Sequence, residues 1–230
     1  MVGRRRGRRR AGWETRVDRR IPEATVARLP LYLQVLVEAV ESGVATISSD
    51  GLARAAGLNS AKVRKDLSCL GTYGTRGVGY PVADLTAEIS QVLGLDGDRH
   101  AVIVGVGNLG AALASYDGFA RKGFEVVGLL DADPAKVGTR VGGHVIESVD
   151  DAATIVRDRR VTFAVIATPA EHAQAATDVM VRSGASAILN FAPVHLSVPD
   201  HVTVRTVDLS VELQILSFYE QVSQPVEATG

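Results

Sequence analysis

"HAVIVGVGNLGAALASY", residues 100–116, places an apolar run of strand length before a glycine-rich loop and a run of small residues that suits a helix. This order of strand, G-x-G-x-x-G loop and helix is typical of the first βαβ unit of a Rossmann domain. Gly105 permits the tight turn, Gly107 lets the backbone approach a pyrophosphate, and Gly110 lets the helix pack closely on the strand. The predicted cofactor loop comprises Gly105, Val106, Gly107, Asn108, Leu109 and Gly110.

A second predicted strand, "FEVVGLLDADP" at 124–134, ends at Asp131, which lies 21 residues after Gly110. An acidic side chain at this position accepts hydrogen bonds from the adenosine ribose of a dinucleotide. Ala132, the next residue, belongs to the same predicted site. No arginine follows at once to hold a 2'-phosphate, so the sequence favours NAD(H) over NADP(H).

Two further strands are predicted in "VTFAVIATP" at 161–169 and "GASAILNFAP" at 184–193. Ligands of doubly wound sheets bind where such strands end. The second strand end is mostly apolar, and burying a cationic nicotinamide there costs more than burying its neutral reduced form. We therefore expect the protein to prefer NADH to NAD+. The strand ends add Thr168, Pro169, Asn190, Phe191, Ala192 and Pro193 to the predicted site.

The chain before residue 95 has the periodicity of helices. In "RLPLYLQVLVEAVESG", 28–43, apolar residues recur at the spacing of an amphipathic helix that closes at Gly43. Two short helices follow around a tight turn at Gly57. Ser49 or Asp50 is the expected N-cap of the first, and Asn59 or Ser60 that of the second. The apolar positions expected to face the core of the first helix are Leu29, Leu33, Leu36, Val37 and Val40.

The third of these helices combines a core-facing side with a basic side. Val63, Leu67 and Leu70 share one face, which turns the basic residues and Ser68 outward. "GTYGTRGVGY", 71–80, suits a hairpin, and "PVADLTAEISQVLGL", 81–95, returns as a helix. This is the plan of a winged helix-turn-helix, whose exposed helix reads a DNA groove. The predicted DNA-binding residues are Ser60, Lys62, Arg64, Lys65, Ser68 and Arg76.

Composition sets the class of protein. The 230 residues carry a formal net charge of -1, but nine arginines lie in residues 1–20, so the remainder is acidic. This tail is either an arm on anionic phosphate or a solvated leader. The single cysteine, Cys69, excludes an intramolecular disulfide, and no apolar run reaches the length of a membrane span. We expect a cytoplasmic protein with no membrane partner.

The predicted fold class is α/β, with an N-terminal winged helix-turn-helix and a doubly wound, parallel Rossmann sheet. The expected boundaries are a basic tail at 1–20, the winged helix at 21–94, the Rossmann domain at 95–207 and a last helix with its tail at 208–230. The last helix, "DLSVELQILSFYEQ" at 208–221, is strongly apolar. It either packs in the core of its own chain or crosses to a partner subunit.

The sequence predicts no enzyme. A dehydrogenase needs a proton donor or acceptor and a substrate domain, and too little chain remains outside the two predicted domains for the latter. One cysteine and five scattered histidines give no metal-ligand spacing. Three rival functions stay open: an NAD-dependent oxidoreductase with a basic N-terminal domain, a module for another nucleotide such as a coenzyme A derivative, and a DNA-binding protein whose nucleotide is purely structural.

Six motifs, "VRKDLS", "GTRGVGY", "GVGNLG", "DADPAKVG", "NFAP" and "VDLSVELQ", stand in an order that resembles the Rex family of bacterial redox-sensing transcriptional repressors. The resemblance implies a homodimer that binds palindromic operator DNA, binds NADH or NAD+, exchanges its C-terminal helices in a domain swap, and releases DNA when NADH binds. Residues that match the family's DNA contacts are Arg64, Lys65, Ser68 and Arg76. Residues that match its cofactor pocket are Gly105, Gly107, Gly110, Asp131, Thr168, Asn190, Phe191 and Pro193.

The resemblance also implies a switch near the nicotinamide. Tyr116 and Asp208 resemble the family's switch pair. Members of the family can carry an arginine where this chain has Gln34. The resemblance implies that this arginine pairs, in the DNA-bound state, with the aspartate that corresponds to Asp208. Gln34 donates a hydrogen bond but lacks the charge that strengthens such a contact, so we expect the contact with Asp208 to be weaker or to be built differently.

Overall fold

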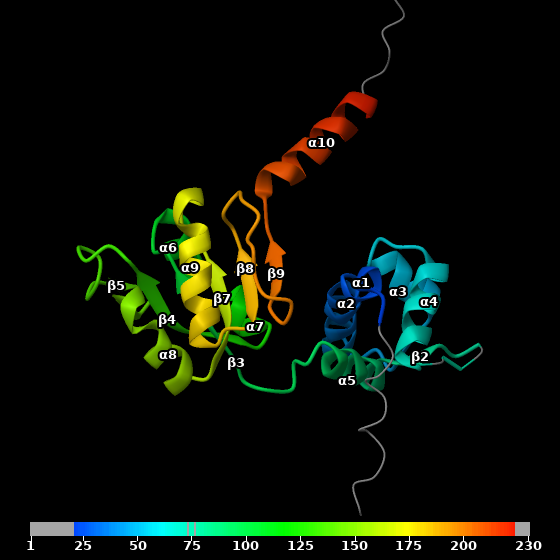
Figure 1. Cartoon of the computed structure of the whole chain (residues 1–230). Helices are drawn as coiled ribbons and strands as arrows, with labels where there is room; N and C mark the ends of the chain where they lie inside the picture. The colour runs from blue at the N-terminus through cyan, green and yellow to red at the C-terminus, as the bar shows by residue number, and fades with distance from the viewer. Residues whose placement is uncertain (1–20, 73, 76, 224–230) are drawn as a thin grey trace, which may run out of the picture. The chain divides into compact units, whose positions relative to one another are not determined.

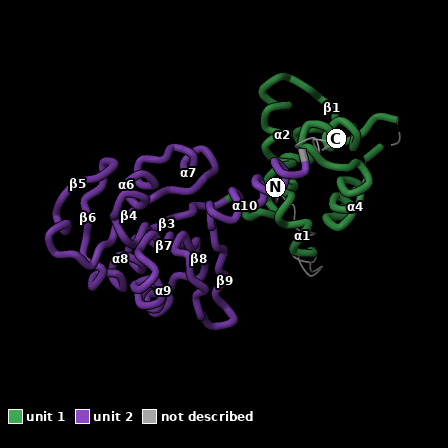
Figure 2. The backbone as a smooth tube through the Cα atoms, turned by 90° about the horizontal axis from the view of Figure 1, so that it is seen from above, with its two compact units in different colours: residues 1–96 green, residues 97–230 purple. Residues whose placement is uncertain are grey.

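The computed structural model describes residues 21–72, 74, 75 and 77–223 (Figure 1). The chain forms two compact units, Met1–Asp96 and Gly97–Gly230, each with its own buried core (Figure 2). Arg76 and the arginine-rich tail lie outside the described residues. None of the described helices is long and apolar enough to cross a membrane.

The first unit is a small helical domain with a two-stranded wing. Its core joins Leu29, Tyr32 and Leu36 to Leu67 and Ile89. Each of these residues comes from a face that repeats every three or four positions, which is why short helices suffice to bury it. The elements are α1 Glu23–Val26, α2 Leu29–Glu41, β1 Thr46–Ile47, α3 Ser49–Ala55, α4 Ser60–Leu70, β2 Tyr80–Pro81 and α5 Val82–Val92.

The predicted hairpin is present. Thr75 pairs with Gly79 across its tip, and β2 then pairs antiparallel with β1, a short strand that the sequence does not signal. Gly79 has φ +96, and a Cβ atom there would overlap the Ile47 carbonyl group. Glycine is therefore required where the hairpin crosses the strand.

Two local predictions are wrong in this unit. Ser48, not Ser49 or Asp50, is the N-cap of α3, because its Oγ accepts the hydrogen bond from Gly51 N at 3.0 Å. Val37 and Val40 are exposed, and Tyr32 takes the core position instead. The hydroxyl of Tyr32 marks it as polar in the sequence, yet its ring is apolar and the hydroxyl finds a buried partner.

The second unit is a seven-stranded sheet in the order β5-β6-β4-β3-β7-β8-β9. All neighbours pair in parallel except β5 with β6. The six parallel strands follow the 3-2-1-4-5-6 order of a Rossmann domain, which confirms the predicted fold class. The strands are β3 Arg99–Val104, β4 Phe124–Asp131, β5 Arg140–Val141, β6 His144–Ser148, β7 Val161–Ile166, β8 Ala187–Asn190 and β9 Thr203–Thr206.

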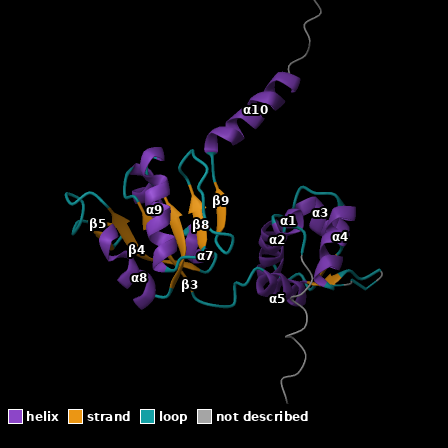
Figure 3. Ribbon diagram, viewed as in Figure 1, coloured by secondary structure: helices purple, strands orange, loops and turns teal. Residues whose placement is uncertain are grey.

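Helices cover this sheet unevenly (Figure 3). On one face, α8 and α9 bury residues such as Ile155 and Met180 against the strands. On the other, α6 covers Ile103 and Val165, and the sheet beyond it keeps an apolar groove. The helical elements of this unit are α6 Asn108–Ala114, α7 Gly118–Arg121, the 3-10 turn η1 Val149–Asp151, α8 Ala152–Asp158, α9 Ala170–Ser183 and α10 Leu209–Ser223.

Candidate functional site

The exposed face of α4 is set by its first turn. Asn59 is the N-cap, as predicted, and its Oδ1 accepts the hydrogen bond from Ala61 N at 2.7 Å. Gly57, with φ +66, closes the tight turn between α3 and α4. With Val63 and Leu67 buried, Lys62, Arg64 and Lys65 are exposed on the opposite side of the helix, and Ser60 and Ser68 are half-buried at its margin. The described part of the predicted DNA-binding set therefore lies on one helix.

Two of these side chains have partners within the unit. The Arg64 guanidinium lies 3.2 Å from the Ser49 hydroxyl oxygen and 3.8 Å from the Asp50 carboxylate, both at the start of α3. Ser68 Oγ donates to the Lys65 carbonyl oxygen at 2.7 Å. The Arg64 contacts are exposed and weak, so the guanidinium can exchange them for a phosphate or a base at little cost.

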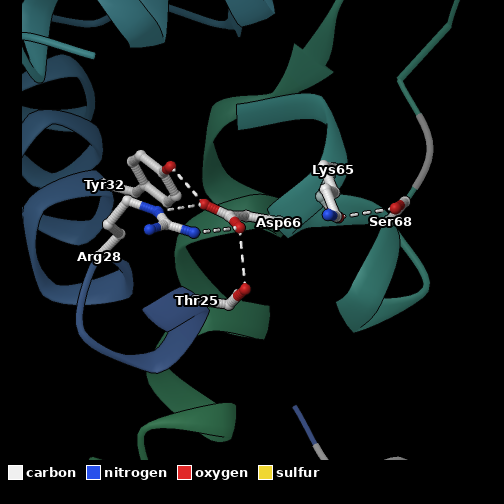
Figure 4. Close-up of polar contacts among 6 residues, drawn as sticks. All are labelled: Thr25, Arg28, Tyr32, Lys65, Asp66 and Ser68. Carbon is white, nitrogen blue, oxygen red and sulfur yellow. Dashed lines mark hydrogen bonds and ion pairs between the residues drawn. The ribbon is translucent and has the colours of Figure 1, made fainter. Parts of the chain in front are cut away.

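The buried side of the same helix holds a polar cluster that the sequence does not reveal (Figure 4). The Asp66 carboxylate is 1% exposed and accepts four hydrogen bonds of 2.7 to 2.8 Å. Two come from the Arg28 guanidinium, one from the Tyr32 hydroxyl and one from the Thr25 hydroxyl. A carboxylate has about four lone-pair positions, so all are satisfied. The cluster ties α4 to α1 and α2.

The cluster also fixes protonation states. Burial favours the neutral form of Asp66, but hydrogen bonds from Arg28, Tyr32 and Thr25 outweigh burial and hold the pKa of the carboxyl below its ordinary value. Burial, with the bond to Asp66, raises the pKa of Tyr32 to about 12. The bond to Asp66 raises the pKa of Arg28 further above its ordinary value. One sequence signal exists, because Asp66 lies within the apolar arc of the helix.

In the second unit, the glycine loop has the tight geometry that its sequence predicts. Gly105 has φ +92, and a Cβ atom there would lie 2.7 Å from Thr168 Cγ2. A Cβ atom on Gly110 would overlap the Gly105 carbonyl oxygen. By contrast, a Cβ atom on Gly107 would meet no atom within 4 Å, and Gly107, Asn108 and Leu109 are exposed. The loop thus presents open backbone at the end of β3.

Asp131 lies at the carboxyl end of β4, beside this loop. Its carboxylate accepts hydrogen bonds from Val106 N at 2.8 Å, from Asp133 N at 2.9 Å and from the Lys136 ammonium at 3.0 Å. Burial favours the neutral acid, but these three donors outweigh burial and lower the pKa of Asp131. The carboxylate is therefore charged near neutral pH. The sequence does not signal the Lys136 contact, because this lysine lies five positions beyond Asp131 and not directly after it.

The ends of β7 and β8 complete the crevice next to the loop. Thr168 Oγ1 is buried and finds no hydrogen-bond partner among the residues that the structure describes. Asn190 is 0% exposed, and its amide binds the backbone of Ala192 and Val194. Asn190 and Ala192, which is also buried, are therefore placed to shape the 191–194 turn, while Phe191 and Pro193 are more accessible. Pro169 is exposed before α9.

The predicted switch residues occupy both units. Gln34 is exposed on α2, with its amide nitrogen 3.5 Å from the Glu38 carboxylate. Tyr116 is 59% exposed, and its ring makes an edge contact with Phe119 at 5.3 Å between centroids. Asp208 lies directly before α10, where hydrogen bonds from the Ser210 hydroxyl and amide lower the pKa of Asp208. Contact between Gln34 and Asp208 stays a prediction.

A pyridine dinucleotide fits these residues. A neutral ribose matches the charged Asp131, a pyrophosphate matches the open backbone of Gly107, and Thr168 Oγ1 is an unsatisfied polar atom that a bound ribose or amide could engage. Within the described parts of the chain, no group of three or more His, Cys, Asp or Glu side chains is placed to hold a metal ion.

Comparison with known proteins agrees with this division. A family model described as a putative DNA-binding protein N-terminus matches residues 20–68. A second model, described as a CoA binding domain, matches residues 96–194. The first covers the helix-turn-helix and the second covers most of the Rossmann sheet.

Curated relatives extend the comparison over most of the chain. A protein of Streptomyces griseus named redox-sensing transcriptional repressor Rex is 58% identical over 89% of this chain and 81% of its own length. The protein of that name from Streptomyces coelicolor is 57% identical over 93% of this chain and 83% of its own. One from Carboxydothermus hydrogenoformans is 44% identical over 86% of this chain and 96% of its own.

Solved structures give the same result. The crystal structure of RSP, described as a Rex-family repressor, matches with a TM-score of 0.80 and 32% identity over 88% of this chain and 94% of that one. RSP in complex with β-NAD+ and operator DNA matches with a TM-score of 0.82 at 33% identity, over 88% and 93% of the two chains. RSP with β-NADH matches at 0.78 and 32% identity, over 88% and 95%.

A helix-turn-helix unit with a basic outer face, joined in one chain to a Rossmann unit with a dinucleotide loop, defines a transcription regulator that carries its own nucleotide sensor. The identities to curated relatives are high over nearly the whole chain. The chain belongs to the Rex family of redox-sensing transcriptional repressors.

Proposed function

We propose that this chain represses transcription by binding palindromic operator DNA, and that it leaves the operator when NADH occupies its Rossmann unit. The observation that carries the proposal is the presence, in one chain, of the outward basic face of α4 and the open glycine loop beside Asp131. The first suits a DNA groove and the second suits a dinucleotide. Relatives with 44 to 58% identity are named as redox-sensing repressors.

On the DNA side, the exposed residues divide by chemistry. Lys62 and Lys65 suit phosphate contacts, which supply affinity without sequence information. Arg64 and Ser68 suit base edges, since a guanidinium forms paired hydrogen bonds with guanine and a hydroxyl serves several bases. Ser60 at the first turn suits a phosphate. Arg76, beyond the described residues, is proposed for the minor groove, where negative potential concentrates.

On the nucleotide side, Gly107 and its neighbours Asn108 and Leu109 are proposed to hold the pyrophosphate, and Val106, whose amide bonds to Asp131, is proposed to hold the loop beside the ribose. Asp131 accepts hydrogen bonds from the adenosine ribose, with Ala132 beside it. The ends of β7 and β8 hold the nicotinamide, which supplies the difference in charge between the two redox forms. The description of the second family model suggests another nucleotide, coenzyme A. The charged Asp131 favours a ribose with free hydroxyls over the phosphorylated ribose of coenzyme A.

We further propose a homodimer that exchanges α10. Every described side chain of α10 is exposed, with Leu213 at 67%. Its apolar residues form two arcs, one with Leu209, Leu213 and Leu216 and the other with Val211, Ile215 and Phe218. A helix of this kind needs apolar surfaces on two sides, which favours insertion into a partner subunit.

The apolar groove on the sheet next to α7 supplies such a surface. Its volume is about 360 Å³ and its lining is almost wholly apolar. It lies on the open face of the sheet, away from the glycine loop. Residues that form it include Ala101, Phe119, Phe124, Phe163, Ala187 and Leu189. In a domain swap, the exposed apolar helix of each subunit would be buried in the exposed apolar groove of the other.

Switching requires that NADH favour one arrangement of the dimer. A tenfold loss of operator affinity needs about 1.4 kcal/mol of coupling. Two recognition helices read successive major grooves only when they are about 34 Å apart. We propose that the NADH-bound dimer departs from this spacing, and that Gln34, Tyr116 and Asp208 are the contacts that change. No catalysis is proposed, and the cytoplasm is the proposed site of action.

The decisive experiment is operator binding by the full-length protein, measured by fluorescence anisotropy. The duplex is a palindrome that the protein itself selects from a random library. We expect NADH to release the duplex, and we expect NAD+ at the same concentration to leave most of it bound.

Each contrary outcome points to a different function. Operator affinity that is indifferent to NADH would reject the proposal in favour of a structural nucleotide. Release of the duplex by coenzyme A, but not by NADH, would favour a coenzyme A sensor. Reduction of a carbonyl compound at the expense of NADH would favour an oxidoreductase.

A further inference from the structure

Lys136 and Asp131 form an ion pair at the point where the second strand of the Rossmann unit meets the ribose site. The ammonium lies 3.0 Å from Asp131 Oδ2. The carboxylate side chain is 9% exposed, whereas the lysine side chain is 39% exposed. The ammonium therefore lies on the solvent side of the pair, where a ligand that approaches Asp131 also approaches Lys136.

The backbone holds Lys136 in this position. After β4 the chain turns through Asp133, whose carbonyl oxygen accepts the Lys136 amide at 3.0 Å. The Lys136 carbonyl oxygen accepts both the amide and the hydroxyl of Thr139, at 3.0 and 2.6 Å. Gly138, two residues after Lys136, donates its amide to the carbonyl oxygen of Ile146 on β6 at 2.8 Å. The lysine is thus presented by a fixed turn that is bonded to the sheet.

We propose that Lys136 is a phosphate-binding group whose charge Asp131 neutralises, so that the Asp131 carboxylate alone makes the site reject a 2'-phosphorylated ribose. The inference rests on the proposed binding of NADH and names the residue that sets its specificity. It implies that this chain needs no added arginine to accept NADPH. Loss of one negative charge is enough.

The riboses of NADH and NADPH differ in the charge and in the hydrogen-bonding groups that they present to Asp131 and Lys136. A hydroxyl of an NADH ribose donates a hydrogen bond, and the Asp131 carboxylate accepts it at its remaining lone-pair position while staying paired with Lys136. A 2'-phosphate carries a charge of about -1.5 to -2 and has only acceptor oxygens to offer when fully ionised. Beside Asp131 it meets a like charge, and Lys136 is already committed. When Asp131 is replaced by an uncharged residue, the Lys136 ammonium is free to form a charge-assisted hydrogen bond to the phosphate.

The test measures Kd for NADH and NADPH by calorimetry on the full-length protein and its variants. Asp131→Asn is expected to weaken NADH about tenfold and to strengthen NADPH about tenfold. In the double variant Asp131→Asn with Lys136→Ala, the gain for NADPH is expected to disappear while NADH stays within about threefold of the single variant. Lys122→Ala, which removes the charge of an exposed lysine at the end of α7, is the matched control and should change neither Kd.

The double variant separates this role from a structural one. If Lys136 only holds Asp131 in place, it has nothing to hold once residue 131 is uncharged, and its removal will leave NADPH affinity as it was in D131N. Equal NADPH affinity in the single and double variants therefore overturns the proposal. So does a D131N variant that gains no NADPH affinity.

A second substitution covers the case in which Asp131→Asn fails to fold. Asp131→Ser keeps a small polar side chain at this position and also removes the charge, and it is measured with and without Lys136→Ala. Wild-type protein that binds neither dinucleotide would instead reject the proposed function. If the wild-type protein binds NADH, but Lys136→Ala does not change NADPH affinity in either the Asp131→Asn or the Asp131→Ser variant, only the role of Lys136 is rejected.

Discussion

Asp66 points inward from the helix that turns Lys62 and Lys65 outward, and this opposition explains how a short, highly charged helix keeps one orientation. Val63 and Leu67 alone would allow the helix to roll, because apolar contacts are not directional. Four hydrogen bonds to a buried carboxylate have fixed directions. The charged cluster therefore sets which residues of α4 face outward.

Replacing Asp66 with asparagine should destabilise the protein by about 3 kcal/mol, because Arg28 is left without its buried counter-charge. The exposed Asp50→Asn, an identical chemical change on a surface pair, should cost less than about 0.5 kcal/mol. Urea unfolding of the full-length proteins at pH 7 measures both. Equal losses in the two variants would contradict a special role for the buried cluster.

The same cluster predicts a pH dependence. The pKa of Asp66 is lower in the folded protein than in the unfolded chain, so the stabilisation is present above the ordinary carboxyl pKa of about 3.9. As pH falls below this value the unfolded chain binds the proton first, and unfolding is favoured. We expect the difference in unfolding free energy between wild type and D66N to shrink as the pH falls from 5 toward the folded pKa. A constant difference over that range would exclude the ion pair as its source.

Two glycines of the loop give a matched pair. Gly110→Ala would drive a methyl group into the Gly105 carbonyl oxygen, so both the melting temperature and NADH affinity should fall. Gly107→Ala places its methyl group in open space at φ -86. We expect an unchanged melting temperature but NADH affinity weaker by about tenfold or more, since the methyl group occupies the approach of the pyrophosphate. Unchanged NADH binding in the Gly107 variant would move the pyrophosphate elsewhere.

At the scale of the element, α4 combines a capped start, a glycine end and one basic face. Asn59 caps its first turn, and Gly71 ends it with φ +87. These two signals limit the helix to eleven residues. The three basic side chains fall within about one turn of this helix. The helix diameter, about 10–12 Å with side chains, fits a major groove about 12 Å wide.

Lys65→Gln tests the phosphate role of this helix. Loss of one phosphate contact should weaken operator binding and reduce the slope of log K against log salt by about 0.9. Because phosphate contacts carry no sequence information, the loss should be similar for specific and mismatched duplexes. Anisotropy titrations between about 50 and 200 mM salt measure this, with Lys122→Gln in the Rossmann unit as control. A loss confined to the specific duplex would assign Lys65 to a base.

At the scale of the whole molecule, the apolar surface of a single chain calls for a partner. The α10 helix is exposed along its described length and the groove next to α7 is uncovered, and we propose that assembly covers both. Assembly as a homodimer also supplies the second recognition helix that a palindrome requires. In the proposed dimer, α10 would therefore serve both stability and DNA recognition.

Charges placed in the arc of α10 that contains Leu213 and Leu216 should disrupt the proposed dimer. Leu213→Glu with Leu216→Glu is expected to shift the protein from dimer to monomer in light scattering and to abolish high-affinity operator binding. The matched control adds the same two charges on the polar side, as Gln214→Glu with Ser217→Glu, and should leave the dimer intact. A dimer that survives the leucine substitutions would place the interface elsewhere.

The sequence by itself determined the two kinds of unit and most of their elements. Strand, glycine loop and helix are local patterns, and the wheel of α4 predicts Lys62, Arg64 and Lys65 outward because a helix face depends only on spacing. The end of β4 at Asp131 and the end of β8 at Asn190 are predictable for the same reason.

Only the tertiary structure decided which polar groups meet. Asp66 reaches Thr25 across 41 positions in sequence and Arg28 across 38, and periodicity carries no information about such pairs. Lys136 lies next to Asp131 because the turn after β4 is bonded to the sheet and folds towards the end of that strand. The Asn190 side chain forms hydrogen bonds with the backbone of the loop that follows it. Side-chain hydrogen bonds depend on distances of a few tenths of an ångström and on rotamers, which the packed fold sets and local sequence does not.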